Sequence, residues 1–135
     1  MPNEIPMDPG LFGVALSGAE QEFLTRALAI WDGVAYPSSA FMTSLGFEDG
    51  RSLVESAQSL EERILRSEPL SRTEWTVALL LSEVGFASDI QGGGLEWEGY
   101  SGIPDRETIA LLRSVQMKLI DIRLRFKRHS GDQVG

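Results

Sequence analysis

Apolar residues recur along most of this chain at spacings of three and four positions. That spacing places them on one face of an α-helix. It marks four long segments, from Phe23 to Val34, Leu53 to Leu65, Trp75 to Phe86 and Ile109 to Phe126. Stretches of alternating polarity are short and lack β-branched runs, so the pattern predicts no strands.

Two capping boxes mark where helices begin. Ser17 is followed three residues later by Glu20, and Ser71 is followed in the same way by Glu74. In this motif, each of the two side chains bonds the backbone N–H of the other residue. Helix ends are predicted where proline or glycine interrupts the apolar pattern, because neither continues a helix well. These positions are Pro37, Pro69 and Gly131.

The remaining segments complete the expected helices. The sequence of residues 38–47 predicts a short helix that stops at Gly46 and packs on the core through residues such as Phe41. The second long helix begins near Asp49. The third long helix, which opens at Trp75, is apolar nearly all round, and such helices usually occupy a central position.

We therefore expect an all-α fold, a compact bundle of four long helices plus one short helix, with an ordered glycine- and aromatic-rich loop before the last helix. A length of 135 residues suits one domain. Prolines and glycines mark residues 1–16 as an irregular N-terminal arm. Residues 17–129 form the single helical domain, and residues 130–135 are expected to be a loose C-terminal tail.

The segment 89–102 is the most unusual part of the chain. It contains five glycines, but also two aromatic residues and three carboxylates. A flexible spacer needs only glycine, serine and similar residues. We therefore expect a fixed shape, in which each aromatic ring either plugs the loop onto the core or forms a binding surface.

Charge is distributed unevenly along the sequence. Residues 1–112 hold 18 acidic and 6 basic residues, a net charge of −12, whereas residues 113–135 hold 2 acidic and 6 basic residues, a net charge of +4. An acidic body opposes binding to phosphate backbones and favours a basic partner. The basic end, Arg123 to Arg128, is interpreted as a complement to the helix dipole. We therefore expect no nucleic acid partner.

Other features limit the location and the chemistry. The N-terminus lacks the basic region of a signal peptide, and the apolar stretches are far shorter than the ~20 residues that span a bilayer. Since there is no cysteine and His129 is the only histidine, we expect no metal site of the usual zinc type and no Ser/His/Asp triad. The absence of cysteine fits a reducing compartment, so we expect a cytoplasmic protein with no membrane partner.

The three consecutive glycines do not predict a phosphate site. A P-loop requires Lys and Ser or Thr after the glycines, and a dinucleotide-binding turn requires a preceding strand. Here Gly94 is followed by Leu95 and Glu96, and a helix precedes the glycines. We therefore expect no nucleotide, metal or other cofactor.

The leading hypothesis is a non-enzymatic, acidic protein-interaction module. Acidic surfaces accelerate association with basic proteins, and an immunity-like or antitoxin-like inhibitor of a basic partner would suit this charge. Self-association into a homo-oligomer is a second use for the aromatic residues. The predicted partner-binding residues are Asp89, Glu96, Trp97, Glu98 and Tyr100.

The rival hypothesis is a small helical-bundle enzyme, or a protein that binds a ligand or cation. Glu83, Asp89 and Glu96 would then meet, with Trp97, in a pocket between the last two helices. The simpler interpretation of Glu83 is a structural ion pair with Arg113 on the last helix. The sequence leaves these alternatives open.

Overall fold

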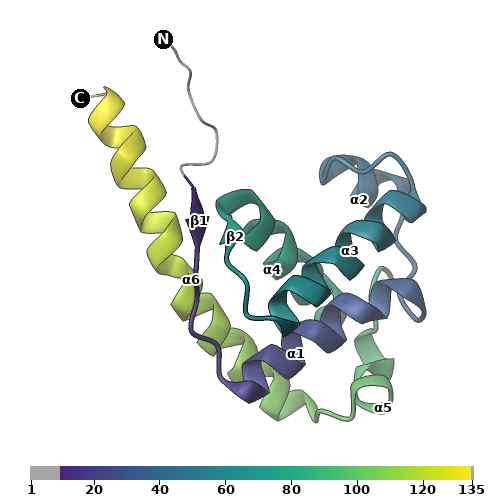
Figure 1. Cartoon of the computed structure of the whole chain (residues 1–135). Coiled ribbons are helices and arrows are strands. Elements are labelled where there is room, and N and C mark those ends of the chain that lie inside the picture. Colours follow the sequence, from purple (N-terminus) through teal and green to yellow (C-terminus); the bar gives the residue numbers. More distant parts are fainter. Residues whose placement is uncertain (1–9, 135) are drawn as a thin grey trace.

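A computed structural model describes the backbone of residues 10–134 and the side chains of residues 10–122. The chain is mostly helical, so the predicted all-α class is confirmed (Figure 1). The helices are α1 (Gly18–Ala29), α2 (Ser39–Ser44), α3 (Gly50–Leu65), α4 (Arg72–Ala87), α5 (Trp97–Ser101) and α6 (Asp105–Val134). Two 3₁₀ turns, η1 (Ile30–Asp32) and η2 (Gly94–Glu96), and two strands, β1 (Leu11–Phe12) and β2 (Leu70–Ser71), complete the structure.

Helix α1 is central to the core. It contacts α3, α4 and α6. Its residues Phe23, Leu24, Ala27 and Leu28 are fully buried. Helix α4, which its apolar sequence marked as the central element, is buried on only part of its surface, because Leu79 and Leu80 are half-buried. This difference leaves apolar surface on α4 beside α6.

Both predicted capping boxes are present. The backbone N–H of Ser17 donates to Glu20 at 2.7 Å, and that of Ser71 donates to Glu74 at 2.8 Å. Reciprocal bonds of this kind satisfy backbone groups that a helix start leaves free. The capping signals therefore placed the starts of α1 and α4 correctly.

The short helix and its packing also agree with the sequence. Gly46, with a φ of +87°, follows α2, as expected for a residue that ends a helix in the left-handed region. Phe41 stacks on Trp31 of η1, with the ring centroids 5.5 Å apart. This contact fixes α2 to the core.

Three expectations about element boundaries were wrong. The segment before the last helix is not only a loop, because it contains η2 and α5. Helix α6 continues to Val134, past the stop expected at Gly131, so its backbone includes residues assigned to a loose tail. The third correction concerns β1 and β2, where Leu11 pairs with Ser71 and Phe12 with Leu70 in antiparallel register. A ladder of two residue pairs is too short to leave an alternating pattern in the sequence.

The pairing of β1 fixes part of the N-terminal arm. The indole N–H of Trp75 donates to the carbonyl oxygen of Phe12 at 2.9 Å. Trp75 thus follows the Ser71 cap and also holds β1 against the start of α4. The residues of the arm before Gly10 lie outside the described part of the chain.

A buried carboxylate joins α1 to α6. Glu20 is 3% exposed, and its side chain accepts hydrogen bonds from Lys118 at 2.5 Å and from Ser114. Burial opposes ionisation of Glu20, but the bonds from Lys118, Ser114 and the Ser17 amide outweigh it and lower its pKa to about 2. Glu20 is therefore an ionised link between the two helices.

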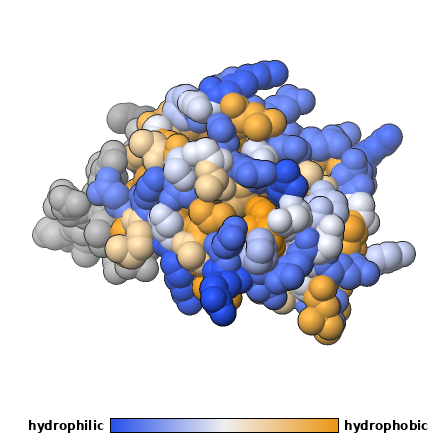
Figure 2. Space-filling view, turned by 90° about the horizontal axis from the view of Figure 1, so that it is seen from below, coloured by the Kyte–Doolittle hydropathy of each residue, from blue (hydrophilic) through white to orange (hydrophobic). Residues whose placement is uncertain are grey.

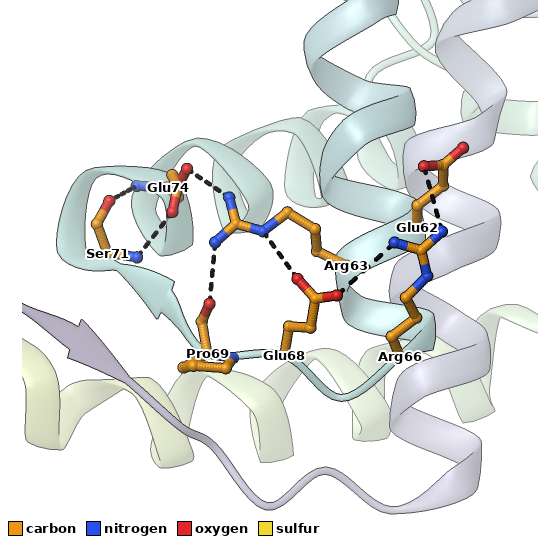
Figure 3. Close-up of polar contacts among 7 residues, drawn as sticks. All are labelled: Glu62, Arg63, Arg66, Glu68, Pro69, Ser71 and Glu74. Atoms are coloured by element: carbon orange, nitrogen blue, oxygen red, sulfur yellow. Dashed lines mark hydrogen bonds and ion pairs between the residues drawn. The ribbon is translucent and has the colours of Figure 1, made fainter.

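A second polar cluster joins α3 to α4 (Figure 3). Arg63 donates to Glu74 at 2.6 Å and to the carbonyl oxygen of Pro69 at 3.0 Å, and it also pairs with Glu68 at 3.5 Å. Because Glu74 belongs to the capping box of α4, the Arg63 guanidinium reinforces the start of that helix.

No helix among residues 10–134 is long and apolar enough to cross a membrane.

Candidate functional site

The segment after α4 has a fixed shape because its backbone packs directly on that helix. The N–H of Gly93 donates to the carbonyl oxygen of Gly85 at 2.7 Å. A Cβ on Gly92 would lie 2.2 Å from the carbonyl oxygen of Val84, which no real side chain allows. Gly94 has a φ of +46°, in the left-handed region that favours glycine. The run of three glycines therefore serves a close backbone contact.

Trp97 anchors the same segment from inside. It is 0% exposed and forms edge-to-face contacts with Phe23 and Phe86, with ring centroids 6.0 and 5.7 Å away. Its indole N–H donates to the hydroxyl of Thr108 at 2.8 Å. Burial of an indole contributes on the order of 5 kcal/mol. Trp97 thus ties the segment to α1, α4 and α6.

The burial of Trp97 decides which of its two expected roles the structure supports. The indole ring of Trp97 packs into the core and holds the loop in place, and a partner cannot reach it without displacing the loop. Tyr100 is different, since it is 39% exposed. Desolvation by burial, and then the nearby negative charge of Glu61, raise the pKa of Tyr100. The phenol therefore lies near Glu61 of α3.

The predicted carboxylates do not converge. Asp89 accepts a hydrogen bond from the backbone N–H of Leu95 at 3.1 Å, and Glu98 accepts one from the backbone N–H of Asp105 at 2.8 Å. The first bond shapes the loop and the second caps the start of α6. Glu96 is exposed on η2. Within the described residues, no group of three or more acidic or histidine side chains could hold a metal ion.

The predicted ion pair between Glu83 and Arg113 is relayed through a third residue. The amide nitrogen of Gln116 donates to Glu83 at 2.7 Å, and the amide oxygen of Gln116 accepts from Arg113 at 2.8 Å. Gln116 lies one turn after Arg113 on α6 and bonds both charged side chains. Glu83 is therefore a partnered carboxylate rather than a free acid.

A groove does exist between α4 and α6, where the rival hypothesis expected a pocket. Its volume is about 420 Å³. Most of its lining is apolar, namely Trp75, Leu79, Leu80, Leu119, Ile120 and Ile122, with Arg72, Thr76, Glu83 and Gln116 as polar members. Of the predicted pocket residues, only Glu83 lines this groove, and Asp89, Glu96 and Trp97 lie elsewhere. The acid–base cluster required for catalysis is not assembled there.

The three most exposed apolar side chains that the structure describes lie on two segments that contact each other. Tyr36, Ile90 and Leu95 are 83%, 82% and 89% exposed, the highest values among large apolar residues whose side chains are described. Figure 2 shows hydrophobic surface as separate patches among hydrophilic residues on one face of the molecule. Exposure of this degree has a solvation cost, so it is informative where several such residues are close together.

Hydrogen bonds through Gln91 join the two segments that carry these residues. The backbone N–H of Tyr36 donates to the carbonyl oxygen of Gln91 at 2.9 Å. The Gln91 side chain accepts from the N–H of Ser38 at 2.7 Å and donates to its hydroxyl at 3.0 Å. We call this region, formed by Tyr36, Ile90 and Leu95 with Asp89 and Glu96, the loop face.

Sequence reasoning missed three members of the loop face, namely Tyr36, Ile90 and Leu95. A local signal existed, since each is a large apolar residue in a turn-forming segment outside the helical periodicity. The expected basic end of the chain, with His129, lies outside the described side chains.

Comparisons with protein-family models, curated proteins and solved structures gave no match.

Proposed function

We propose that this chain is a non-enzymatic protein-interaction module and that the loop face binds its partner. The observation that carries the proposal is the combination of a fixed backbone with exposed apolar side chains. Buried Trp97 and the close-packed Gly92 hold the loop, while Ile90 and Leu95 extend into solvent. A flexible tail could expose such residues without consequence, but an ordered loop holds them in a defined arrangement.

A fixed loop favours binding for two reasons. The chain loses less conformational entropy on association when the binding shape already exists. Apolar side chains at the centre of an interface, surrounded by polar groups, also contribute most of the affinity in typical complexes. The loop face has this composition, with Ile90 and Leu95 beside Asp89 and Glu96.

Charge indicates the chemistry of the partner. Asp89 and Glu96 belong to a body that carries a net charge of −12 over residues 1–112. Such a surface attracts a basic protein and speeds the encounter at low ionic strength. The specific form of the proposal is an inhibitor that masks a cationic protein, in the manner of an immunity protein or antitoxin, within the cytoplasm.

An enzyme has less support than an interaction module. Only Glu83 of the three predicted carboxylates borders the groove between α4 and α6, and Gln116 already bonds it. General acid–base work on two carboxylates needs both near the same substrate. Asp89 instead accepts a hydrogen bond from a backbone N–H of the chain itself, and Glu96 is exposed on η2.

The test is selective capture of a partner from the native host. The purified chain is immobilised, and bound proteins are identified by mass spectrometry for the wild type and for the double variant Ile90→Ser/Leu95→Ser. Leu65→Ser is the matched control, because Leu65 is an exposed leucine at the end of α3, outside the loop face. We expect a basic protein that the wild type and the control retain and the double variant loses.

Salt and charge give a second readout of the same complex. Binding of the captured protein is expected to weaken as salt rises, because screening reduces attraction between opposite charges. Glu96→Lys should slow association further. The proposal fails if no captured protein distinguishes the double variant from Leu65→Ser, or if the captured protein is acidic.

A further inference from the structure

The groove between α4 and α6 has apolar walls that the described part of the chain covers only in part. Leu79 and Leu80 of α4 are half-buried, and Ile120 of α6 is 38% exposed. The volume of about 420 Å³ lies within the range of clefts that bind ligands. Contiguous apolar surface of this kind is costly in water and favours an occupant.

The two ends of the groove differ in their residues. At one end the Gln116 side chain donates to Glu83 at 2.7 Å. At the other end lie Arg72 and Trp75, in the first turn of α4. Along the helix Arg72 and Glu83 are about 16 Å apart. The groove therefore follows α4 for about three turns, which suits an elongated occupant.

The strand β1 brings the start of the described chain to the Arg72 end of the groove (Figure 1). Leu11 pairs with Ser71, the residue before α4. The indole N–H of Trp75, which lines the groove, donates to the carbonyl oxygen of Phe12 at 2.9 Å. Because the β1–β2 pairing is antiparallel, the chain before Leu11 is directed toward the first turn of α4.

The segment that precedes Gly10 is long enough to follow the whole groove. It consists of residues 1–9, which we call the leading segment. Fully extended, nine residues reach about 30 Å, whereas the groove extends over about 16 Å of α4. Gly10 has a φ of +135°, a conformation that L side chains rarely adopt, so the chain can change direction at this residue.

The leading segment has the sequence of an extended strand with one apolar side. Three of its residues are prolines, which oppose a helix and push the residue before them into an extended conformation. Successive side chains of an extended backbone point to opposite sides. Ile5 and Met7 therefore share one side, and Glu4 and Asp8 share the other.

A segment of this composition suits a groove with helical walls. The backbone groups of a helix bond one another, so the walls offer no β ladder and an occupant is held through its side chains. Because proline has no N–H, the leading segment buries fewer backbone donors that would need an acceptor. Ile5 and Met7 supply the apolar contacts, and the flexible thioether of methionine adapts to irregular walls.

Charge favours the same occupant. Arg72 is the one cation among the lining residues that the structure describes. The leading segment contains Glu4 and Asp8 and neither lysine nor arginine. Asp8 is only two positions before Gly10, so its carboxylate would enter at the end of the groove where the guanidinium of Arg72 lies. Opposite charges at the rim of a site fix the orientation of the bound segment.

We propose that the leading segment binds in extended form along the groove between α4 and α6 of its own chain, with Ile5 and Met7 against the apolar walls. Only two residues separate Met7 from Gly10, and such a tether gives the segment a millimolar local concentration, which free competitors rarely reach. The inference is independent of the proposed function, because the groove and the loop face share no described residue.

The first test uses the unaltered chain, labelled at its methyl groups, at a concentration where it is monomeric. We expect nuclear Overhauser effects from the methyl groups of Ile5 and Met7 to those of Leu80 and Ile120. Ile109 is the matched reference, because it is also an exposed isoleucine of α6 but lies outside the groove. Ile109 should show no contact with the leading segment.

The second test is a disulfide, which the absence of native cysteine makes unambiguous. Ile5→Cys is combined with Leu80→Cys in the groove or, as the control, with Val77→Cys. Val77 is also half-buried on α4 but lies outside the groove. Under mild oxidation, the pair at positions 5 and 80 should form an intramolecular disulfide roughly tenfold faster than the pair at positions 5 and 77.

Three results would overturn the proposal. The first is a wild-type spectrum without contacts between the leading segment and the groove, and the second is an equal rate for the two cysteine pairs. The third is a disulfide that joins two chains, which would assign the groove to a second copy. Ile90→Ser/Leu95→Ser should leave the methyl contacts unchanged, so failure of the loop face and failure of this proposal are distinguishable.

Discussion

Gly92 lies directly against Gly85, so that a Cβ on Gly92 would come within 2.7 Å of the Gly85 Cα. The nearest atoms to such a Cβ, the carbonyl oxygen of Val84 and the Cα of Gly85, are backbone atoms, which cannot rotate away. Gly85 is itself enclosed on its other side, since its own Cβ would lie 3.2 Å from the carbonyl oxygen of Ala27. Helix α1, helix α4 and the following loop therefore meet closely at Gly85, and Gly92 has no room for a methyl group.

Gly92→Ala should accordingly be strongly destabilising. We expect the free energy of unfolding, measured by urea titration, to fall by about 3 kcal/mol, as is typical of overpacked sites. Gly99→Ala is the control, because a Cβ there meets no atom within 4 Å and the residue lies in α5. Equal stability of the two variants would contradict the close backbone contact.

The hydrogen bond from Trp97 to Thr108 provides a second prediction. Thr108→Val keeps the shape of the side chain but leaves the buried indole N–H without its acceptor, at a cost of about 1–3 kcal/mol. Thr108→Ser retains the hydroxyl and should cost less. Thermal or urea unfolding of the two variants gives the comparison, and a valine variant as stable as the serine variant would rule out a structural role for this bond.

Glu20 predicts an acid-dependent loss of stability. Its pKa is lowered from 4.5 to about 2 in the folded chain, so its ionised form stabilises the fold above pH 4.5. That contribution, about 3 kcal/mol, is lost as pH falls from about 4.5 to about 2. The stability difference between wild type and Glu20→Gln should therefore be large at pH 7 and shrink across this window.

The control for Glu20 is Glu22→Gln. Glu22 is exposed and pairs with Arg26 on the surface of the same helix at 2.7 Å, an arrangement that contributes little. Its substitution should change stability by less than about 0.5 kcal/mol at any pH. If Glu20→Gln behaves in the same way, the buried link between α1 and α6 is not a stabilising one.

Arg63 is expected to matter more than other surface arginines. Arg63→Met keeps the aliphatic stem but removes the bonds to Glu74, Glu68 and the carbonyl of Pro69, and it should cost about 1–2 kcal/mol. Arg51→Met is the control, since Arg51 makes only an exposed pair with Glu55 at 3.9 Å. Urea unfolding at neutral pH compares the two variants, and a cost for Arg63→Met no larger than that of the control would contradict the prediction.

The Arg63→Met variant should also change the titration of the Glu74 carboxyl group. In the folded chain burial opposes ionisation of Glu74, but hydrogen bonds from Ser71 and the charge of Arg63 outweigh it and lower the pKa of Glu74. Arg63→Met should raise that pKa, which NMR titration of the carboxyl carbon can measure. An unchanged pKa would show that the guanidinium does not act on the capping box.

The sequence contained the local signals that place most helices. Capping at Ser17 and Ser71 and the left-handed Gly46 depend on residues a few positions apart, so the sequence reveals them directly. The order of the segment after α4 could be expected in the same way. The fate of Trp97 could not, because it depends on Phe23 and Phe86, which only the fold brings to the same place.

Other features depended on competition between nearby candidates. Arg113 and Gln116 are one turn apart on α6, and the spacing alone cannot tell which of them reaches Glu83. The β1–β2 pairing arises from contact with Leu70 and Trp75, far away in sequence. Sequence periodicity also marks a residue as apolar without saying which neighbour covers it, and this is why the exposure of Ile109 and Ile120 on α6 was not anticipated.

The loop after α4 separates the residues that hold its shape from the residues that meet solvent. Gly92 and Trp97 face inward and tolerate little substitution, whereas Ile90, Leu95 and Glu96 face outward, where a new side chain would not disturb the backbone. If the loop face binds a partner as proposed, selection can alter what it recognises one residue at a time, with the scaffold left intact. Such an arrangement suits a protein whose counterpart also changes over evolutionary time.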